Sequence, residues 1–424
     1  MIMKKLLALS LALVMVFGLS TTALAQSTIS FSWWGGDARH EATIKAVDAF
    51  EAKNPDIAVS DEYSAWSGWE EKMGQRFASN SAPDLNQINW NWITAFSSDG
   101  SKFVDLNTLS DIIDLSQFEK SGLDACTVAG KLQGLPVSMT GRIFYWNKAA
   151  FEKAGIGVPA SHAELMAAGQ VFKDKLGEDY YPLVLGTYDR MILMVFYLES
   201  VHGKDWVVEN KLNYTKDEIA AGLNFIKEME DGHVIPTLMK LTGDGADSLD
   251  KNNNWMDGHY GGIFEWDSAA GKFQKALNED QEFVVGEHFS DWGEYQGGYA
   301  KVSMALAISE TAQDKEAAAK LLNFLLNEEE GVALMESQRG IPLSKKANEY
   351  LAANKLLDPI VAEANAKVLS WVRFNLDPLF ESNELKADET GVYAQVMANL
   401  SYGEVDVDGA ADMLIEGVNS VLGN

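Results

Sequence analysis

The stretch GKLQGLPVSMTGRIFYWNKAAFEKAGI, residues 130–156, determines the expected architecture of the whole chain. A short strand is expected over residues 134–138, and a second extended, aromatic run follows at 143–146. Gly141 separates the two runs with little room for a turn, and a helix is expected directly afterwards, over 149–154. We interpret this order as a strand path that leaves one domain and enters another through a hinge. The alternative is an ordinary β-α junction.

The residues upstream of this stretch predict a β-α-β unit. Residues 28–34 alternate large apolar side chains with smaller ones, which is typical of a strand. A helix is expected to run through Phe50, and further strands are expected from Ile57 and over 83–88. A β-α-β connection implies parallel strands, so we expect a doubly wound α/β domain here.

Helices and short strands continue to alternate downstream. The run 302–308, preceded by Gly297-Gly298, is interpreted as the return crossing between domains. A long helical stretch is expected over 315–338, with an interruption near Gly331. The sequence contains no internal repeat, low-complexity segment or long linker. The remaining elements are expected at 165–176, 183–185, 191–201, 216–229, 257–268 and 283–285.

The first 25 residues are predicted to form a signal peptide. Two lysines precede an apolar run at 6–19, and Ala23-Leu24-Ala25 provides a small-residue cleavage site. This run is shorter than the ~20 residues that span a bilayer. The chain is therefore expected to be exported, and to be periplasmic or associated with the cell surface. Its only cysteine is Cys126, so we expect a buried core thiol, no lipid anchor and no disulfide.

The composition favours two soluble domains in a chain of 424 residues. Apolar residues make up 47% of the chain, which is enough for sizeable cores. The net charge of −28 becomes −30 when the two signal-peptide lysines are removed. Such an acidic surface repels nucleic acid and anionic lipid and favours a monomer. Twelve tryptophans are many for one chain, so some of them are candidates for a ligand surface.

The sequence contains no motif that favours catalysis or a cofactor. G-x-S-x-G, the phosphate-binding P-loop and H-E-x-x-H are absent. A secreted glycoside hydrolase remains an alternative with Glu265 as its best acid, although 62 acidic residues would supply a carboxylate pair by chance. Residues 250–254 resemble a calcium loop only weakly, because the sixth-position glycine and the closing glutamate are missing. We predict no catalytic residue, no metal ligand and no cofactor, with a structural calcium ion left open.

Aromatic and polar residues gather at the predicted strand ends, where open α/β sheets bind ligands. A sugar ring has an apolar face that fits tryptophan, and its hydroxyl groups pair with planar amide, carboxylate and guanidinium groups. Burying ~100 Å² of apolar area per ring would contribute roughly 2.5 kcal/mol, so several rings could reach the ~8 kcal/mol of micromolar binding. The predicted ligand-binding residues are Trp34, Gly36, Asp37, Arg39, His40, Trp66, Asn89, Trp90, Asn91, Arg142, Tyr188, Asp189, Glu265, Trp266, Trp292, Gly298 and Trp371.

Each of these residues also has a structural interpretation. Trp33 continues the apolar face of its strand, so we expect Trp33 in the core and Trp34 toward the ligand. Trp90 and Trp92 are two residues apart, and we expect Trp90 to face the ligand. Trp255, Trp292 and Trp371 lie near loops or a helix start of the second domain, and about half of such residues would serve packing alone.

Three arginines are candidates for the cleft, and they bear on the charge of the ligand. If Arg39, Arg142 and Arg190 all face it, an acidic sugar such as a uronic acid is favoured, because guanidinium groups match carboxylates. The alternative for Arg142 is a salt bridge within its own domain.

Taken in order, several short motifs resemble family 1 extracellular solute-binding proteins, the maltose-binding-protein-like receptors of ABC sugar importers. They are Asn54-Pro55, Pro83-Asp84, Gly134-Leu135-Pro136, Asn147-Lys148 and the block at 315–347. The resemblance implies a two-lobed, type II periplasmic-binding-protein-like α/β fold. Each lobe would be a mostly parallel sheet flanked by helices, and a multi-strand hinge would join them. In similar receptors an aromatic residue at the position of Trp371 often stacks on the sugar.

This resemblance also implies how the chain is divided and what it does. The first lobe would comprise residues 26–140 and 299–343, and the second 141–298 and the helical segment 344–424. An oligosaccharide would bind between the lobes and be delivered to a membrane permease. A secreted carbohydrate-active enzyme, or the same receptor with a non-sugar ligand, remains an alternative.

Overall fold

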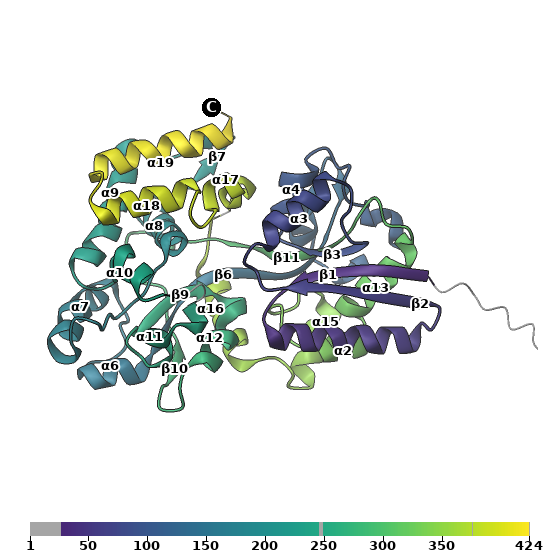
Figure 1. Ribbon diagram of the computed structural model, residues 1–424, viewed down its shortest axis with the longest axis horizontal. Helices are drawn as coiled ribbons and strands as arrows, with labels where there is room; N and C mark the ends of the chain where they lie inside the picture. Colours follow the sequence, from purple (N-terminus) through teal and green to yellow (C-terminus); the bar gives the residue numbers. More distant parts are fainter. Residues whose placement is uncertain (1–26, 246–248, 375, 424) are drawn as a thin grey trace, which may run out of the picture.

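The computed structural model describes residues 27–245, 249–374 and 376–423, so the predicted signal peptide lies outside the described residues. Two α/β lobes lie side by side and are joined by strands that run from one to the other (Figure 1). The N-lobe is built around β1 (Ser27–Trp34), β2 (Ile57–Ser64) and β3 (Leu85–Ile88). The C-lobe is built around β9 (Gly262–Trp266) and β10 (Phe283–Val285).

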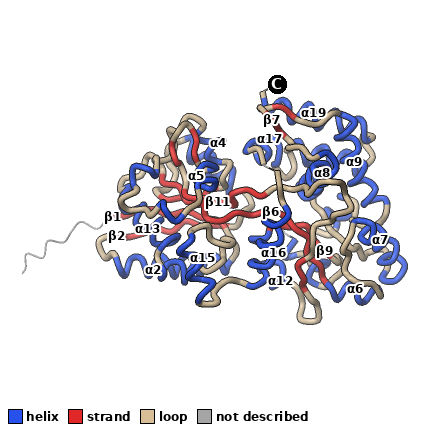
Figure 2. Tube along the Cα trace, turned by 180° about the vertical axis from the view of Figure 1, so that it is seen from behind, coloured by secondary structure: helices blue, strands red, loops and turns tan. Residues whose placement is uncertain are grey.

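One long strand, β6 (Leu135–Asn147), belongs to both lobes. Its first half pairs with β11 (Ala300–Ile308) in the N-lobe sheet, and its second half pairs with β9 and β10 in the C-lobe. Seen from behind, β6 and β11 cross the middle of the molecule together (Figure 2). The two strand runs predicted at 134–138 and 143–146 therefore form a single strand. The return crossing predicted at 302–308 is β11.

Gly141 lies at the middle of β6, opposite Ala300 of β11. A Cβ atom at this position would lie 2.5 Å from Cγ1 of Val368 and 3.0 Å from the carbonyl oxygen of Tyr299. Glycine is therefore required here by close approach, because real Cβ atoms do not come so near to backbone or packed side chains. The absent side chain lets a C-lobe helix lie directly against the hinge strand.

In the N-lobe, β2, β1 and β3 are parallel, as the β-α-β pattern predicts. Strand β11 is antiparallel both to β3 and to β6, so it alone among the described strands of the N-lobe sheet runs in the opposite direction and the sheet is mixed. Helices α3 and α4 lie on one side of the strands, and α2 and α15 lie on the other (Figure 1). The N-lobe helices are α2 (Asp37–Lys53), α3 (Trp69–Ala78), α4 (Trp92–Ser97), α5 (Lys120–Ala125), α13 (Lys315–Asn327), α14 (Glu329–Met335) and α15 (Lys345–Ala353).

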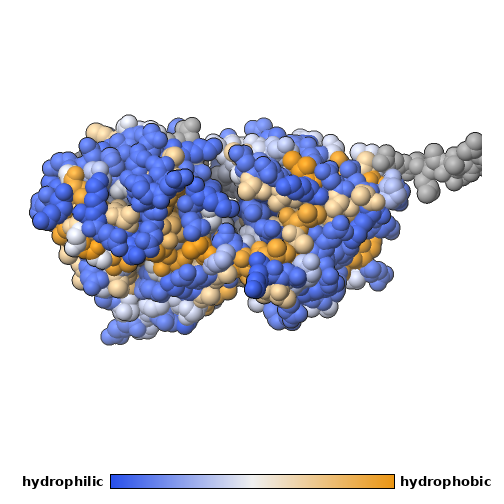
Figure 3. Space-filling view, turned by 90° about the horizontal axis from the view of Figure 1, so that it is seen from below, coloured by the Kyte–Doolittle hydropathy of each residue, from blue (hydrophilic) through white to orange (hydrophobic). Residues whose placement is uncertain are grey.

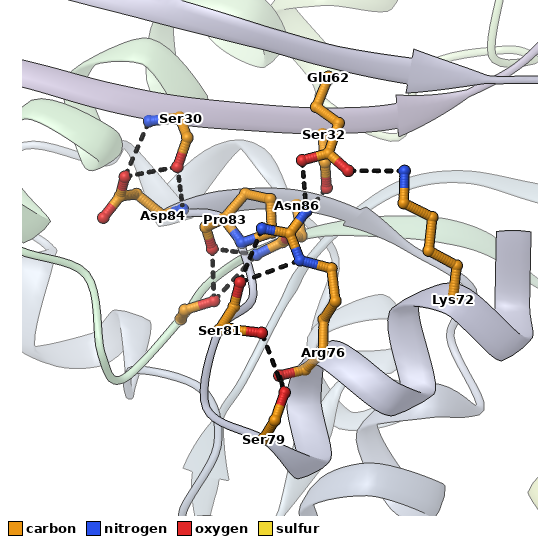
Figure 4. Close-up of polar contacts among 11 residues, drawn as sticks. Ser30, Ser32, Glu62, Lys72, Arg76, Ser79, Ser81, Pro83, Asp84 and Asn86 are labelled. Atoms are coloured by element: carbon orange, nitrogen blue, oxygen red, sulfur yellow. Dashed lines mark hydrogen bonds and ion pairs between the residues drawn. The ribbon is translucent and has the colours of Figure 1, made fainter.

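Buried and half-buried polar side chains connect β1 to β3 and to Asp84, the residue before β3. The Asp84 carboxylate accepts hydrogen bonds from the backbone N–H and the hydroxyl of Ser30, at 2.8 and 2.7 Å (Figure 4). Two residues along, the Ser32 hydroxyl donates to Oδ1 of Asn86 at 2.8 Å. Because buried polar groups must be paired, these bonds fix the register of the two strands and the position of their carboxyl ends.

The C-lobe is largely helical around its short strands. A tryptophan, Trp146, and a phenylalanine, Phe144, project from β6 into its core and are fully buried. Two short hairpins complete the chain: β4 (Thr127–Val128) with β5 (Lys131–Leu132) in the N-lobe, and β7 (Val207–Val208) with β8 (Lys211–Leu212) in the C-lobe. The C-lobe helices are α6 (Lys148–Ala154), α7 (His162–Leu176), α8 (Thr187–His202), α9 (Lys216–Asp231), α10 (Leu238–Gly243), α11 (Asn253–Met256), α12 (Ala270–Ala276), α16 (Pro359–Trp371), α17 (Asn383–Lys386), α18 (Val392–Tyr402) and α19 (Val407–Leu422).

Three element boundaries differ from the sequence predictions. Helix α8 begins at Thr187, so the residues expected in a strand-end loop form its first turn. The long helix at 315–338 is interrupted at Glu328, between α13 and α14, and not near Gly331. Helix α15 packs on α13 and α14, so the last crossing to the C-lobe follows it and does not occur at 343/344.

Cys126 is fully buried, and burial raises the pKa of its thiol to about 12. A thiol with such a pKa stays protonated and unreactive at neutral pH. Cys126 is thus a core residue, as predicted.

Among the described residues, no helix is both long enough and apolar enough to cross a bilayer.

Candidate ligand-binding site

Five of the predicted ligand-binding residues meet where β6 enters the C-lobe. Arg142 lies directly opposite Trp266 in the β6–β9 pairing, and its guanidinium carbon lies 4.8 Å from the centre of the indole ring. Nη1 of Arg142 donates to Oδ1 of Asp189 at 2.5 Å, and its Nη2 lies 3.9 Å from Oε1 of Glu265. The ring of Tyr188 lies on the same guanidinium, at 5.7 Å. The strand β9 and the first turn of α8 hold these groups together.

Two lysines and a glutamate that the sequence analysis missed complete this group. Lys301 of β11 lies 4.7 Å from the centre of the Trp266 ring and forms a buried ion pair with Glu381. Lys386 of α17 lies 3.9 Å from Oε1 of Glu381 and over the ring of Tyr188. We call the eight residues the interlobe cluster: Arg142, Tyr188, Asp189, Glu265, Trp266, Lys301, Glu381 and Lys386.

Glu381 links the two lobes. It ends the 3-10 turn η5 (Pro378–Glu381), which packs against α4 of the N-lobe. Its carboxylate accepts from Nε1 of Trp90 at 3.2 Å and from the Tyr188 hydroxyl at 2.9 Å. Its backbone carbonyl accepts from Nδ2 of Asn91 at 2.8 Å. Trp90 and Asn91, both predicted from the sequence, therefore reach the C-lobe cluster through this one residue.

The electrostatics of the interlobe cluster follow from burial and close pairing. Burial favours the neutral form of Glu381, but Lys301 and Lys386 outweigh burial and lower its pKa to about 2. Burial lowers the pKa of Lys301 to about 8, so its ammonium group is still charged at neutral pH. The pKa of Glu265 is raised, chiefly by burial, although Arg142 opposes the shift. Three cations thus share three carboxylates with little access to water.

An aromatic group from the N-lobe borders the interlobe cluster. Trp34, at the end of β1, is 9% exposed and lies edge-on to Trp66, with ring centres 5.1 Å apart. Trp66 stacks on Trp92 at 6.2 Å and is half-buried. The ammonium group of Lys386 lies 5.2 Å from the Trp66 ring, so the two groups are continuous. Trp66 and Trp266, both half-buried, are the tryptophans of this region with ring surface left for a ligand.

A second charged feature lies at the end of β1. Arg39 donates from Nε to the carbonyl of Gln338 at 2.9 Å and from Nη1 to the carbonyl of Trp34 at 3.2 Å. Arg339, a residue that the sequence analysis missed, donates from Nε to Oε1 of Gln87 at 2.7 Å. Gln87 in turn donates to the same carbonyl of Trp34. We call Arg39 and Arg339 the arginine pair.

The other predicted residues of the N-lobe lie close by without joining the interlobe cluster. Gly36 and Asp37 are exposed at the start of α2. His40 accepts a hydrogen bond from Nε1 of Trp33 at 3.1 Å, so it lies with the core tryptophan on that side of β1. Asn89 is buried and accepts from the backbone N–H of Trp90.

Two predicted ligand-binding residues of the C-lobe, Trp292 and Gly298, and the candidate Arg190 are buried by the packing. Trp292 is 7% exposed and packs in the core against the ring of Phe289, so it presents no surface to a ligand. Gly298 is buried, and both its N–H and its carbonyl are used by protein groups. Arg190 is buried in a pair with Glu230 and does not face the interlobe cluster.

Trp371 remains a prediction. It is half-buried, and its ring stacks on His288 at 5.4 Å. Nε2 of His288 donates a hydrogen bond to the carbonyl oxygen of Arg142, at 2.8 Å, so a chain of contacts connects Trp371 to the backbone of the interlobe cluster.

No group of three or more metal-ligating side chains is found in the described part of the chain. Asp250, in the stretch weakly similar to a calcium loop, pairs with Lys272 at 2.9 Å, and Asn252 caps α11. The absence of a bound metal therefore stays a prediction.

Two α/β lobes, joined by crossing strands and carrying aromatic and charged groups from both sides at their junction, define a solute-binding protein with a hinge between its lobes. The two lobes meet at a narrower middle in the space-filling view (Figure 3). The chain belongs to the bacterial extracellular solute-binding protein family, whose sequence profile matches residues 45–364. The resemblance inferred from the short motifs is thereby confirmed.

Solved structures show the same fold over almost the whole chain. A periplasmic solute-binding protein from Pectobacterium atrosepticum is 33% identical, with a TM-score of 0.88, over 94% of this chain and 99% of that one. A periplasmic oligogalacturonide-binding protein from Yersinia enterocolitica, solved with saturated digalacturonic acid, is 31% identical, with a TM-score of 0.89 over the same shares. The predicted type II, two-lobed α/β fold is confirmed.

Curated relatives match over a shorter region. A putative binding protein from Brucella abortus is 32% identical over 133 residues, or 31% of this chain. The match spans about a third of the length of that relative, 32%.

Proposed function

We propose that this protein binds an oligosaccharide between its lobes and delivers it to the membrane permease of an ABC importer, without catalysing a reaction. It would act outside the cytoplasm as a monomer. The observation that carries the proposal is the interlobe cluster, in which Glu381 joins Trp90 of the N-lobe to Lys301 and Tyr188. A ligand in contact with this group touches both lobes at once.

The chemistry of the interlobe cluster suits a sugar. Trp266 and Trp66 offer half-buried indole rings, and the faces of such rings suit apolar C–H surfaces. Asp189, Glu265 and Arg142 offer planar groups that can exchange paired hydrogen bonds with neighbouring hydroxyl groups. The similarity to the oligogalacturonide-binding protein from Yersinia enterocolitica makes galacturonides the first ligands to test.

Closure of the lobes would couple binding to transport. A ligand shifts an equilibrium only by its difference in affinity for the two states. Contacts to Trp66 from the N-lobe and to Trp266 from the C-lobe exist together only when the lobes are close, so the ligand favours the closed form. The closed form would then be the one that the permease recognises.

Calorimetric titration with a panel of acidic and neutral oligosaccharides tests this proposal. We expect Trp266→Ala to weaken binding by about 2 kcal/mol, or roughly 30-fold, because a stacking surface is lost. Tyr402→Ala removes an aromatic side chain that is 42% exposed elsewhere on the C-lobe, and it should leave the affinity unchanged. Equal affinities of wild type and Trp266→Ala would contradict the proposed site. If none of the sugars bound to the wild type, the proposed function would be contradicted.

Product analysis of the same mixtures separates binding from hydrolysis. A glycosidase needs one carboxylic acid and one carboxylate flanking the bond. Asp189 is bonded to Arg142 in the structure, and Glu381 is bonded to Lys301. We expect intact oligosaccharide after prolonged incubation, and clean cleavage at a catalytic rate would overturn the transport function.

A further inference from the structure

The three arginines that the sequence offers for the cleft, together with Arg339, fall into two classes. Arg142 and Arg190 are buried against carboxylates, Asp189 and Glu230 respectively. The arginine pair has no carboxylate within ion-pair distance among the described residues. All protein partners that hold the pair are neutral carbonyl and amide groups, or a thioether sulfur.

Arg339 is the more enclosed member. Its side chain is 3% exposed, and its Nη2 atom is buried without any hydrogen-bond partner. The Nη1 atom meets only Sδ of Met335, at 3.6 Å, which is a weak acceptor. One edge of a buried guanidinium is therefore left without an oxygen to bind.

Arg39 is fixed beside it by the backbone. Gly35 makes room for Arg39, since a Cβ atom at Gly35 would lie 2.5 Å from Cδ of the arginine. The two carbonyls that accept its hydrogen bonds belong to Trp34 and to Gln338, which immediately precedes Arg339. Burial lowers the pKa of Arg39 to about 10, and burial together with the charge of Arg39 lowers the pKa of Arg339.

Such an arrangement costs stability. A buried cation without a counter-charge loses its hydration and gains no ion pair, and a second cation nearby adds repulsion. Groups with strongly perturbed pKa values gather at functional sites, and a ligand of opposite charge would compensate the two arginines. Two guanidinium groups fit an oxyanion, because both offer N–H donors. A carboxylate is planar and can accept paired hydrogen bonds from a guanidinium group.

The arginine pair is connected to the sugar site through the hinge strands. The carbonyl of Arg339 accepts a hydrogen bond from the hydroxyl of Ser138 on β6, at 2.7 Å, and that hydroxyl also bonds Ser303 of β11. Ser303 is two residues from Lys301 of the interlobe cluster, which is roughly 7 Å along a strand. A sugar chain that lies on Trp266 and Lys301 could therefore extend toward the pair.

We propose that Arg39 and Arg339 form a carboxylate-binding subsite, so that the ligand is an oligosaccharide of uronic acid units and not a neutral one. This inference rests on the proposed function and assigns the charge of its ligand. The sequence favours an acidic sugar if Arg39, Arg142 and Arg190 all face the cleft. Arg142 and Arg190 are paired with protein carboxylates, and Arg339 takes their place beside Arg39.

Two matched ligands test the charge directly. Digalacturonate and its dimethyl ester have the same rings and hydroxyl groups, and they differ in the carboxylate charges. We expect wild-type protein to bind the acid roughly 10- to 100-fold more tightly than the ester in calorimetric titration, as charged hydrogen bonds would give. Arg339→Gln should abolish most of this preference by weakening the acid alone. Arg39→Gln, at a half-buried position, should act in the same direction and serves if Arg339→Gln does not fold.

Controls separate the subsite from a structural role. Arg76→Gln removes an N-lobe arginine that pairs with Glu62, and it should not change the preference. Without ligand, Arg339→Gln should melt no lower than wild type, because an uncompensated charge is removed. Equal loss of acid and ester binding in both variants would show that the arginines only support the fold, and would overturn the inference.

Different outcomes would overturn the carboxylate-binding subsite and the proposed transport function. If wild-type protein binds neutral oligosaccharides as well as acidic ones, and Trp266→Ala weakens both, the carboxylate subsite is wrong and the transport function stands. If a phosphorylated sugar binds through the pair and galacturonate does not, the carboxylate assignment is wrong. If no sugar binds at all, both proposals are wrong.

Discussion

At the scale of single residues, Glu381 has the largest expected effect on the interlobe cluster. It is 1% exposed, and its carboxylate meets Lys301, Tyr188 and Trp90. Loss of one partner from a buried ion pair leaves the other charge without compensation, which typically costs about 3–5 kcal/mol. We therefore expect Glu381→Gln to lower the free energy of unfolding by roughly this amount in urea titrations at pH 7.

A matched variant is available for this test. Glu62→Gln removes a carboxylate that pairs with Lys72 and Arg76 at a position where it is 30% exposed. Exposed pairs contribute little, so we expect a change below about 1 kcal/mol. Equal losses in the two variants would contradict a special role for Glu381.

His288 makes the stability of the C-lobe depend on pH. Burial lowers its pKa from 6.5 to about 4, and its ring stacks on Trp371. The unfolded chain therefore binds a proton more readily than the folded chain, and stability falls as the pH drops from 6.5 toward 4. The shift corresponds to about 3 kcal/mol at the acid end.

His288→Gln tests this dependence, because a glutamine can still bond the carbonyl of Arg142 without titrating. We expect the variant to lose less stability than wild type between pH 6.5 and pH 4. Burial raises the pKa of Asp267 to about 6, so this carboxyl raises the stability as the pH falls in part of this range. Asp267 is present in both proteins, so its effect is common to them. Parallel pH profiles for wild type and variant would contradict the assignment.

At the scale of elements, the close contact of Gly141 with α16 makes β6 sensitive to a single methyl group. Gly141→Ala would place its Cβ atom 2.5 Å from Val368 and 3.0 Å from the carbonyl of Tyr299. Overpacking of this kind typically costs 1–3 kcal/mol, so we expect about that loss in chemical unfolding. Gly157→Ala, where a Cβ atom meets nothing within 4 Å, should change stability by less than about 0.5 kcal/mol. A Gly141→Ala protein as stable as wild type would show that the helix can move away.

The strands and helices of regular pattern could be predicted from the sequence, and the exceptions have physical causes. Alternation of apolar residues identified β1 and the strong helical period identified α13. Gly141 was interpreted as a joint between two strands, whereas β6 runs through it, because pairing with β11 and β9 on its two halves outweighs the low strand propensity of glycine. Asp189 was placed in a loop but bonds the backbone N–H of Gly186, as a residue in the first turn of a helix does.

The site could be predicted only where it follows strand ends of clear pattern. Trp266, Glu265 and Arg142 lie on paired strands, so their meeting follows from the topology. Glu381 and Arg339 lie in irregular segments after the last strand, and no periodicity indicates which way such side chains point. Trp292 has the same local signals as a ligand-facing tryptophan, and only the tertiary packing against Phe289 distinguishes it.

At the scale of the whole molecule, the lobes are joined by two strands, by the chain crossing between α15 and α16, and by the contact of η5 with α4. Most other contacts lie within one lobe, so relative motion of the lobes is the expected response to a ligand. The strongly acidic composition, with a net charge of −28, is consistent with a soluble receptor that does not adhere to anionic surfaces.

Small-angle scattering of the protein with and without saturating digalacturonate tests the central claim, that a sugar binds between the lobes and closes them. Calorimetry on the same samples establishes that the ligand is bound. We expect a smaller radius of gyration for the bound wild type, and no change for Trp266→Ala at a concentration where the variant stays free. An unchanged radius of gyration in wild-type protein that demonstrably holds the ligand would contradict this claim.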